Sequence, residues 1–124
     1  MDFEAKIAEL GLLIPKPAKP AGSYKPCVIV DNIAYISGQG PLLEDGSFAK
    51  GKVGADVDLE TAQNHARLCG LAILSALKNE IGSINKVDQL IKLTGFVNCI
   101  ESFTQQPLVT VSYTHLTLPT RLSV

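Results

Sequence analysis

The residues best suited to chemistry lie where a predicted strand ends, at Ser37-Gly38-Gln39-Gly40-Pro41. A serine hydroxyl and an amide side chain can each donate and accept hydrogen bonds. The glycines on either side of the amide allow a ligand or another backbone to come close, and the proline stops the strand. This pattern predicts a polar lip at a strand end, where sheet proteins tend to bind small molecules. Two interpretations of Ser37 stay open, because its hydroxyl could contact a ligand or close the turn before Gly38.

Other reactive side chains have simpler interpretations. Cys99 could act as a nucleophile after a predicted strand, but no histidine lies near it in sequence, so a packed thiol is expected. His65 falls near the polar side of a predicted helix and is expected to face solvent. The adjacent acids Glu44 and Asp45 precede a glycine, which is typical of a solvated loop. Gln39 is interpreted as a structural amide.

A predicted hairpin positions the polar lip. Val28–Val30 and Ile33–Ser37 are rich in β-branched and aromatic residues, which favour strands. Asp31 and Asn32 separate these runs, and both residue types tolerate a positive φ angle. The sequence therefore predicts a tight two-residue turn between two antiparallel strands.

A long amphipathic helix is predicted over residues 59–81. Asp58 can cap its start and Gly82 can end it. Its apolar stripe recurs at intervals of three and four residues: Leu59, Ala62, Ala66, Cys69, Ile73 and Leu77.

Three further segments complete the expected order of elements. Residues 2–10 predict a short helix that must dock on the rest of the chain, and the prolines of residues 15–20 predict an extended arm. Residues 87–98 carry apolar side chains at both odd and even positions, which predicts a strand covered on both faces. The order strand, strand, helix, strand favours an α+β fold with helices packed on one side of a sheet.

The composition excludes several classes of protein. The chain has 124 residues, 46% of them apolar, which is enough for one domain with a real core. The net charge of −1 and the lack of a basic run give no support to nucleic-acid binding. No apolar run is long enough to span a membrane. The cysteines Cys27, Cys69 and Cys99 are odd in number and widely spaced, so reduced, mostly buried thiols in a cytoplasmic protein are expected, and no metal site.

Several stretches, taken in order, resemble the YjgF/RidA family. They are Ser23-Tyr24, the hairpin end Tyr35–Pro41, the loop Gly51–Asp56, the Ala-Arg-Leu-Cys helix and Thr94–Asn98. The match runs from about residue 3 to residue 109. The resemblance implies a chorismate-mutase-like α+β fold, with a mixed sheet carrying helices on one face, and homotrimers with ligand clefts between subunits. It also implies hydrolysis of reactive enamines and imines to ketoacids and ammonia, with no metal or organic cofactor.

The family's site residues are carried over only where this sequence matches. Tyr24 matches a tyrosine that lines the family's cleft, and Ser37 and Gly38 match the strand-end pair beside it, so these three are the expected substrate-binding residues. The family's carboxylate-binding arginine and its water-positioning glutamate have no identifiable counterparts. Arg121 is not assigned as that arginine, because its neighbours do not match. The catalytic residues therefore stay unassigned.

The end of the chain departs from the family pattern. We expect residues 1–109 to form an incomplete YjgF/RidA-like domain, and residues 110–124 to be a non-matching tail, not native to the protein. The tail is rich in threonine and β-branched residues, which predicts a poor helix. The family's C-terminal part is then missing, and we expect impaired activity.

Two functions from different classes follow. The first is RidA-like hydrolysis of enamines and imines, and the alternative is a non-catalytic trimer that binds small metabolites in the same clefts. RNA cleavage is a third hypothesis. It would need a basic groove, and the sequence does not predict one.

Overall fold

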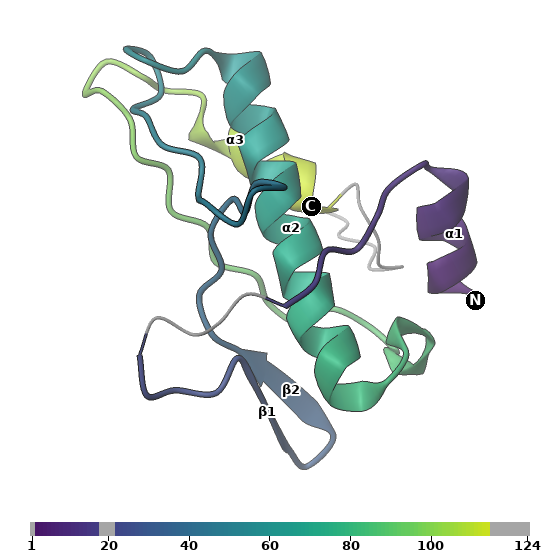
Figure 1. Ribbon diagram of the computed structural model, residues 1–124. Helices are drawn as coiled ribbons and strands as arrows, with labels where there is room; N and C mark the ends of the chain where they lie inside the picture. The colour runs from purple at the N-terminus through teal and green to yellow at the C-terminus, as the bar shows by residue number, and fades with distance from the viewer. Residues whose placement is uncertain (1, 18–21, 115–124) are drawn as a thin grey trace.

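The structure is a computed structural model that describes residues 2–17 and 22–114. Its central element is the long helix α2 (Leu59–Ile81), around which the other segments are arranged (Figure 1). The remaining elements are α1 (Phe3–Glu9), β1 (Cys27–Val30), β2 (Ile33–Ile36), the single-turn 3-10 helix η1 (Ile84–Lys86) and α3 (Gln106–Thr114).

The ends of α2 follow from local chemistry. The Asp58 carboxylate accepts a hydrogen bond from the Thr61 amide at 2.8 Å, which satisfies one of the free N–H groups of the first turn. At the other end, Gly82 has a φ angle of 88° and its amide donates to the Lys78 carbonyl. A residue with a Cβ would be strained in that left-handed conformation, so the glycine ends the helix. The predicted bounds of this helix are confirmed.

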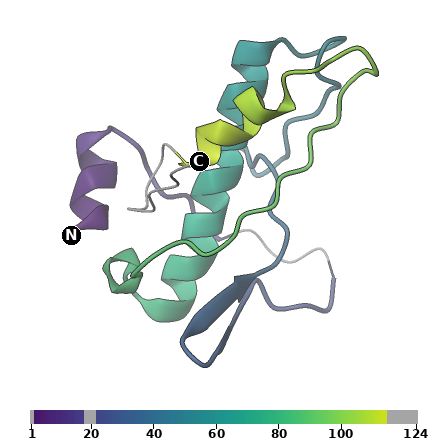
Figure 2. The ribbon, with the colours of Figure 1, turned by 180° about the vertical axis from the view of Figure 1, so that it is seen from behind.

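Burial of α2 is more extensive than its apolar stripe predicts. Residues 69–72 and 74–77 are all buried, although consecutive residues point in different directions around a helix. Two segments cross α2 on opposite sides: residues 12–17 cross one side in Figure 1, and residues 87–98 cross the other in Figure 2. The buried Ser75 hydroxyl donates to the Pro15 carbonyl at 2.6 Å and so fixes the first crossing.

The core consists of two clusters on different parts of α2. The α1 cluster combines side chains of α1, β1, η1 and the C-terminal half of α2: Phe3, Ile7, Cys27, Leu71, Leu74, Leu77 and Ile84. The α3 cluster combines the N-terminal half of α2 with a loop and α3: Val53, Val57, Ala62, Ala66 and Val109. Both clusters share α2, so neither can form unless this helix is in place.

The hairpin forms with the predicted two-residue turn. β1 and β2 are antiparallel and pair Cys27 with Ile36 and Val30 with Ile33. Asp31 and Asn32 have φ angles of 49° and 66°, the two positive values that a type I′ turn needs. This hairpin is the only sheet in the described residues, so the expected mixed sheet is not formed within them.

Residues 87–98 do not form the predicted strand. Among the described residues, the backbone hydrogen bonds of this segment lie at its two ends, where the Val87 amide donates to the Ile84 carbonyl and the Asn98 carbonyl accepts from the Val53 amide. The segment is extended, but a strand needs a partner along its length. The expectation of two covered faces is also wrong, because Phe96 is 92% exposed and Ile91 is 68% exposed.

The expectation of a poor helix after residue 109 is wrong for residues 110–114, which belong to α3. Pro107 lies in the first helical turn, where its missing N–H costs no hydrogen bond. Val109 is buried against α2, and the Thr110 hydroxyl donates back to the Gln106 and Pro107 carbonyls. Tertiary packing therefore overrides the low helix propensity. Residues 18–20 of the predicted arm and residues 115–124 of the predicted tail, including Arg121, lie outside the described residues.

A polar latch joins α1 to the end of α2. The Glu4 carboxylate pairs with Lys78 and accepts a hydrogen bond from the Ser83 hydroxyl. Asn85 accepts from the Glu4 amide at 3.0 Å and donates to Asp2 at 3.0 Å. The contacts with Lys78 and then Ser83 lower the pKa of Glu4, because they favour its charged form.

The α1 cluster predicts a large effect of trimming Leu74, which is only 3% exposed. We expect Leu74→Ala to lower the free energy of unfolding by about 2–5 kcal/mol, because it removes apolar contacts and leaves a cavity. Leu13→Ala is the control, since Leu13 is 86% exposed, and it should change stability by less than about 0.5 kcal/mol. Urea unfolding followed by circular dichroism measures both. Equal effects of the two substitutions would contradict this packing.

The latch predicts a dependence of stability on pH. Because the pKa of Glu4 in the folded chain lies below its ordinary value of 4.5, its contribution is present above that pH and is lost as the pH falls through the lowered value. We expect Glu4→Gln to flatten the loss of stability between about pH 5 and pH 3. Thermal melts over this range, with Glu9→Gln on the same helix as control, measure the difference. A variant with the wild-type pH profile would show that the latch does not form.

Candidate functional site

Ser37 lies where β2 leaves the hairpin, and both of its polar groups contact the segment that enters β1. Its amide donates to the Pro26 carbonyl at 2.9 Å, and its hydroxyl donates to the Lys25 carbonyl at 2.6 Å. The hydroxyl proton is therefore committed to the hairpin, which supports the structural interpretation of Ser37. The hydroxyl oxygen can still accept a hydrogen bond from a ligand.

The other two predicted binding residues flank this contact. Tyr24 directly precedes Lys25 and is 47% exposed. Gly38 follows Ser37, and a Cβ added to it would meet no atom within 4 Å, so the space beside it is open. Tyr24, Lys25, Ser37 and Gly38 are called the hairpin corner below. The Gln39 side chain donates to the Ser37 carbonyl at 3.3 Å, in keeping with its interpretation as a structural amide.

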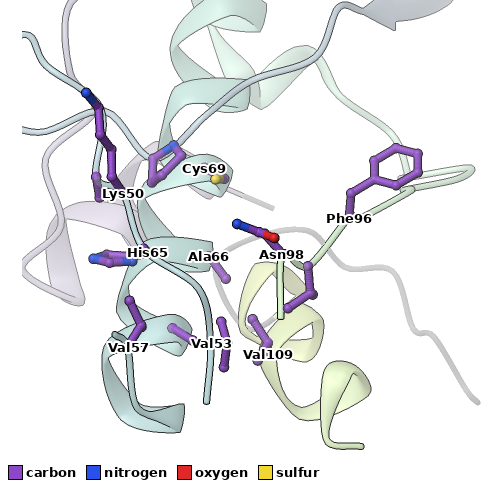
Figure 3. Close-up of a pocket in the computed structure, with 14 residues that line it drawn as sticks. Lys50, Val53, Val57, His65, Ala66, Cys69, Phe96, Asn98 and Val109 are labelled. Carbon is purple, nitrogen blue, oxygen red and sulfur yellow. The ribbon is translucent and has the colours of Figure 1, made fainter. Parts of the chain in front are cut away.

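A separate cleft of about 370 Å³ lies between α2, α3 and the loops that precede them (Figure 3). Its floor is apolar and belongs to the α3 cluster: Val53, Val57, Ala62, Ala66 and Val109. Three polar side chains, Lys50, His65 and Asn98, also line it. None of the residues of the hairpin corner does, so the structure places the predicted site residues and this cleft apart.

His65 is the cleft residue that the sequence analysis interpreted differently. It was expected to face solvent, but it is half-buried and lines the cleft. The reason is that the loop carrying Lys50 and Val57 lines the cleft on the same side as His65 (Figure 3). No pattern in the sequence of this loop indicates that it lies against the helix, so the position of His65 could not have been found from the sequence.

The cysteines behave as packed thiols. All three are free, Cys27 and Cys69 are buried, and Cys99 is half-buried. The Cys99 sulfur accepts a hydrogen bond from the Gln106 side chain at 3.5 Å, and no histidine contact is made there within the described residues. Burial, and then the charge of Glu80, raises the pKa of the Cys27 thiol. A raised pKa disfavours the nucleophilic thiolate, so Cys27 is not an activated nucleophile.

The acidic loop is structural. Asp45 accepts hydrogen bonds from the hydroxyl and the amide of Ser47, and these contacts lower its pKa. Glu44 and Asp45 are both exposed. The loop is therefore a solvated turn closed by its own aspartate, as predicted.

The charged groups of the described residues include one arginine, Arg67 on α2. It is exposed, its guanidinium donates to Asn64 at 3.5 Å, and it lines neither the cleft nor the hairpin corner. The described residues contain no group of three or more His, Cys, Asp or Glu side chains that could hold a metal ion. In the same part of the chain, no helix is both long enough and apolar enough to cross a membrane.

Comparison with known proteins decides the family. Residues 4–119 match the model of the family described as "YjgF/chorismate mutase-like, putative endoribonuclease". The chain belongs to the YjgF/chorismate mutase-like family. The hairpin, α2 and α3 described above are therefore parts of a YjgF fold.

Relatives of known structure support this assignment. The YjgF chain superposes with a TM-score of 0.89 and 28% identity on a "putative endoribonuclease" from Shewanella oneidensis, covering 94% of this chain and 77% of that one. It superposes with a TM-score of 0.81 and 37% identity on a protein of unknown function from Agrobacterium tumefaciens, covering 91% of this chain and 70% of that one.

A curated relative shows the same partial coverage. The YjgF chain is 33% identical to protein TCP17 of Trypanosoma cruzi over 105 residues, which are 85% of this chain and 66% of the relative. The chain thus spans slightly less than two thirds of the length of that protein.

The hairpin corner predicts a measurable role for the Ser37 hydroxyl. We expect Ser37→Ala to lower the free energy of unfolding by about 0.5–1.5 kcal/mol, because the Lys25 carbonyl loses its hydrogen bond. Ser23→Ala, a change at an exposed residue next to the corner, should have an effect below about 0.5 kcal/mol. Urea denaturation compares the two. If Ser37→Ala is as stable as the wild type, the hydroxyl does not hold the hairpin.

Proposed function

We propose that this chain carries part of a small-molecule site that hydrolyses reactive enamines and imines to ketoacids and ammonia, with Tyr24, Ser37 and Gly38 lining the substrate side. The observation that supports it is the meeting of these three residues at one exposed corner of a YjgF fold. The hairpin register that brings Cys27 opposite Ile36 also brings the segment before β1 beside the segment after β2. Tyr24 and Gly38 are the chain neighbours of the two residues, Lys25 and Ser37, that the hydrogen bond of the Ser37 hydroxyl joins.

The proposed reaction needs little from the protein beyond positioning. An enamine gains a proton at carbon to give its imine, and water adds to the imine carbon. The carbinolamine then loses ammonia to leave the ketoacid, so one water is consumed and one ammonia is released. At the corner, the Ser37 oxygen could accept a hydrogen bond from substrate or water, and Tyr24 could pack against the substrate. No metal or organic cofactor takes part in this scheme.

The second candidate function is binding of small metabolites without turnover. It is favoured by the position of Arg67, the one arginine of the described residues, which lies on α2 and outside the corner. A carboxylate substrate is gripped best by a guanidinium fork, and the corner offers Lys25 as its cation instead. The corner as described can therefore hold a small polar molecule more readily than it can orient one for reaction.

The oligomeric state and the cellular compartment are part of the same proposal. Val28, Val30, Ile33 and Tyr35 lie on one face of the hairpin and are exposed, and an apolar face of this kind is typical of a protein–protein interface. This supports a homotrimer with ligand clefts between subunits. The free, mostly buried thiols support a cytoplasmic setting. RNA cleavage is not proposed, because a net charge of −1 gives no support to binding a nucleic-acid backbone.

Two measurements on the same protein test the proposed function. We expect 2-oxobutanoate to raise the melting temperature of the wild-type chain and to do so less in Ser37→Ala, because the corner would contact the ligand. Turnover is measured as pyruvate release from 2-aminoacrylate generated enzymatically in the assay. We expect little acceleration, since no arginine of the described residues reaches the corner.

Ser23→Ala serves as the control for both measurements. Clear acceleration that is lost in Ser37→Ala would establish the hydrolase and reject the non-catalytic binder. Stabilisation by the ketoacid without turnover would favour the binder. A protein that neither binds the ketoacid nor accelerates the reaction would overturn the proposed site.

A further inference from the structure

The cleft between α2 and α3 has the dimensions of a small-molecule site. Its volume of about 370 Å³ lies within the range of roughly 300–1,000 Å³ that is typical of ligand pockets. Its floor is closed by buried valine and alanine side chains, among them Val53, Ala62 and Val109. The small residues on α2 create the hollow, because Ala62 and Ala66 have no side chain beyond Cβ to fill it.

Three polar side chains at the cleft have unused hydrogen-bonding capacity. The ammonium of Lys50, the imidazole of His65 and the side-chain amide of Asn98 make no hydrogen bond or salt bridge with any residue of the described ranges 2–17 and 22–114. Figure 3 shows them at separate points of the lining, with the Asn98 amide directed toward the side formed by α2. They come from a loop, from α2 and from the extended segment, so only the folded chain places them around one cleft.

The charge of the lining is one-sided. No Asp or Glu lines the cleft, whereas Lys50 is a cation and His65 and Asn98 can donate hydrogen bonds. The nearest acids in the sequence are already engaged, because Asp56 accepts from the Lys52 amide at 3.1 Å and Asp58 accepts from the Thr61 amide. The cleft therefore offers positive charge and donors above an apolar floor, with no carboxylate to repel an anion.

We propose that this cleft binds a small organic anion with an aliphatic body, whose charged end is held at the rim by the exposed ammonium of Lys50 and whose body lies on the apolar floor between His65 and Asn98. The site is distinct from the hairpin corner, because no corner residue lines it. The inference does not depend on the proposed enamine or imine chemistry. It stands or falls on whether an anion enters between α2 and α3.

The test is an NMR titration of the 124-residue chain with hexanoate, with hexan-1-ol and hexylamine as probes of the same length and different charge. We expect hexanoate to shift the ring resonances of His65 and the methyl resonances of Val53 and Val109. The alcohol should bind more weakly and the amine weakest, because only the anion complements the lining. Lys50→Met keeps a long unbranched side chain but removes the charge, and it should weaken hexanoate binding about two- to fivefold.

Lys52→Met is the matched control, since Lys52 is an exposed lysine two residues away that does not line the cleft. It should leave hexanoate affinity unchanged. Equal affinity for all three probes, equal effects of the two lysine substitutions, or shifts confined to the hairpin corner would overturn the proposal. Because Lys50 is exposed, Lys50→Met should fold like the wild type, and its circular dichroism spectrum provides that check.

Discussion

The whole structure depends on the burial of α2 on more than one side. A helix with a single apolar stripe would pack on one neighbour, whereas here residues 69–72 and 74–77 are buried all round. The arm that contains Pro15 crosses one side and residues 87–98 cross the other. Gly70, Ala72 and Ala76 are among these buried residues, and side chains this small allow neighbouring segments to pack closely on a helix.

This arrangement gives α2 two different ends. Around its C-terminal half, large aliphatic and aromatic side chains fill the α1 cluster, and the polar latch of Glu4, Ser83 and Asn85 closes it. Around its N-terminal half, alanines and valines make up the α3 cluster, and smaller side chains leave a cleft open. The C-terminal half of α2 packs against the hairpin, and the N-terminal half borders the cleft with its polar side chains.

Membership of the YjgF family gives the fold a context but does not settle its chemistry. The corner around Ser37 has a hydroxyl, a phenol and open backbone space, which are groups that bind and orient. It has no activated thiol, no metal cluster and no arginine among the described residues. The hydrolysis proposed above needs little from such groups beyond the alignment of water and substrate.

The sequence by itself determined the elements whose causes are local. Asp31 and Asn32 fix the hairpin turn through their own tolerance of positive φ, and Asp58 and Gly82 fix the ends of α2 through capping. The conformation or burial of three other parts of the chain was decided only by the tertiary structure, because it depends on residues that are distant in the sequence. Residues 87–98 lack a partner strand along their length, Val109 gains a buried position that stabilises α3, and His65 lines a cleft beside the loop that carries Lys50 and Val57. Local propensity cannot report whether a partner is present, so these features could not be predicted from the sequence.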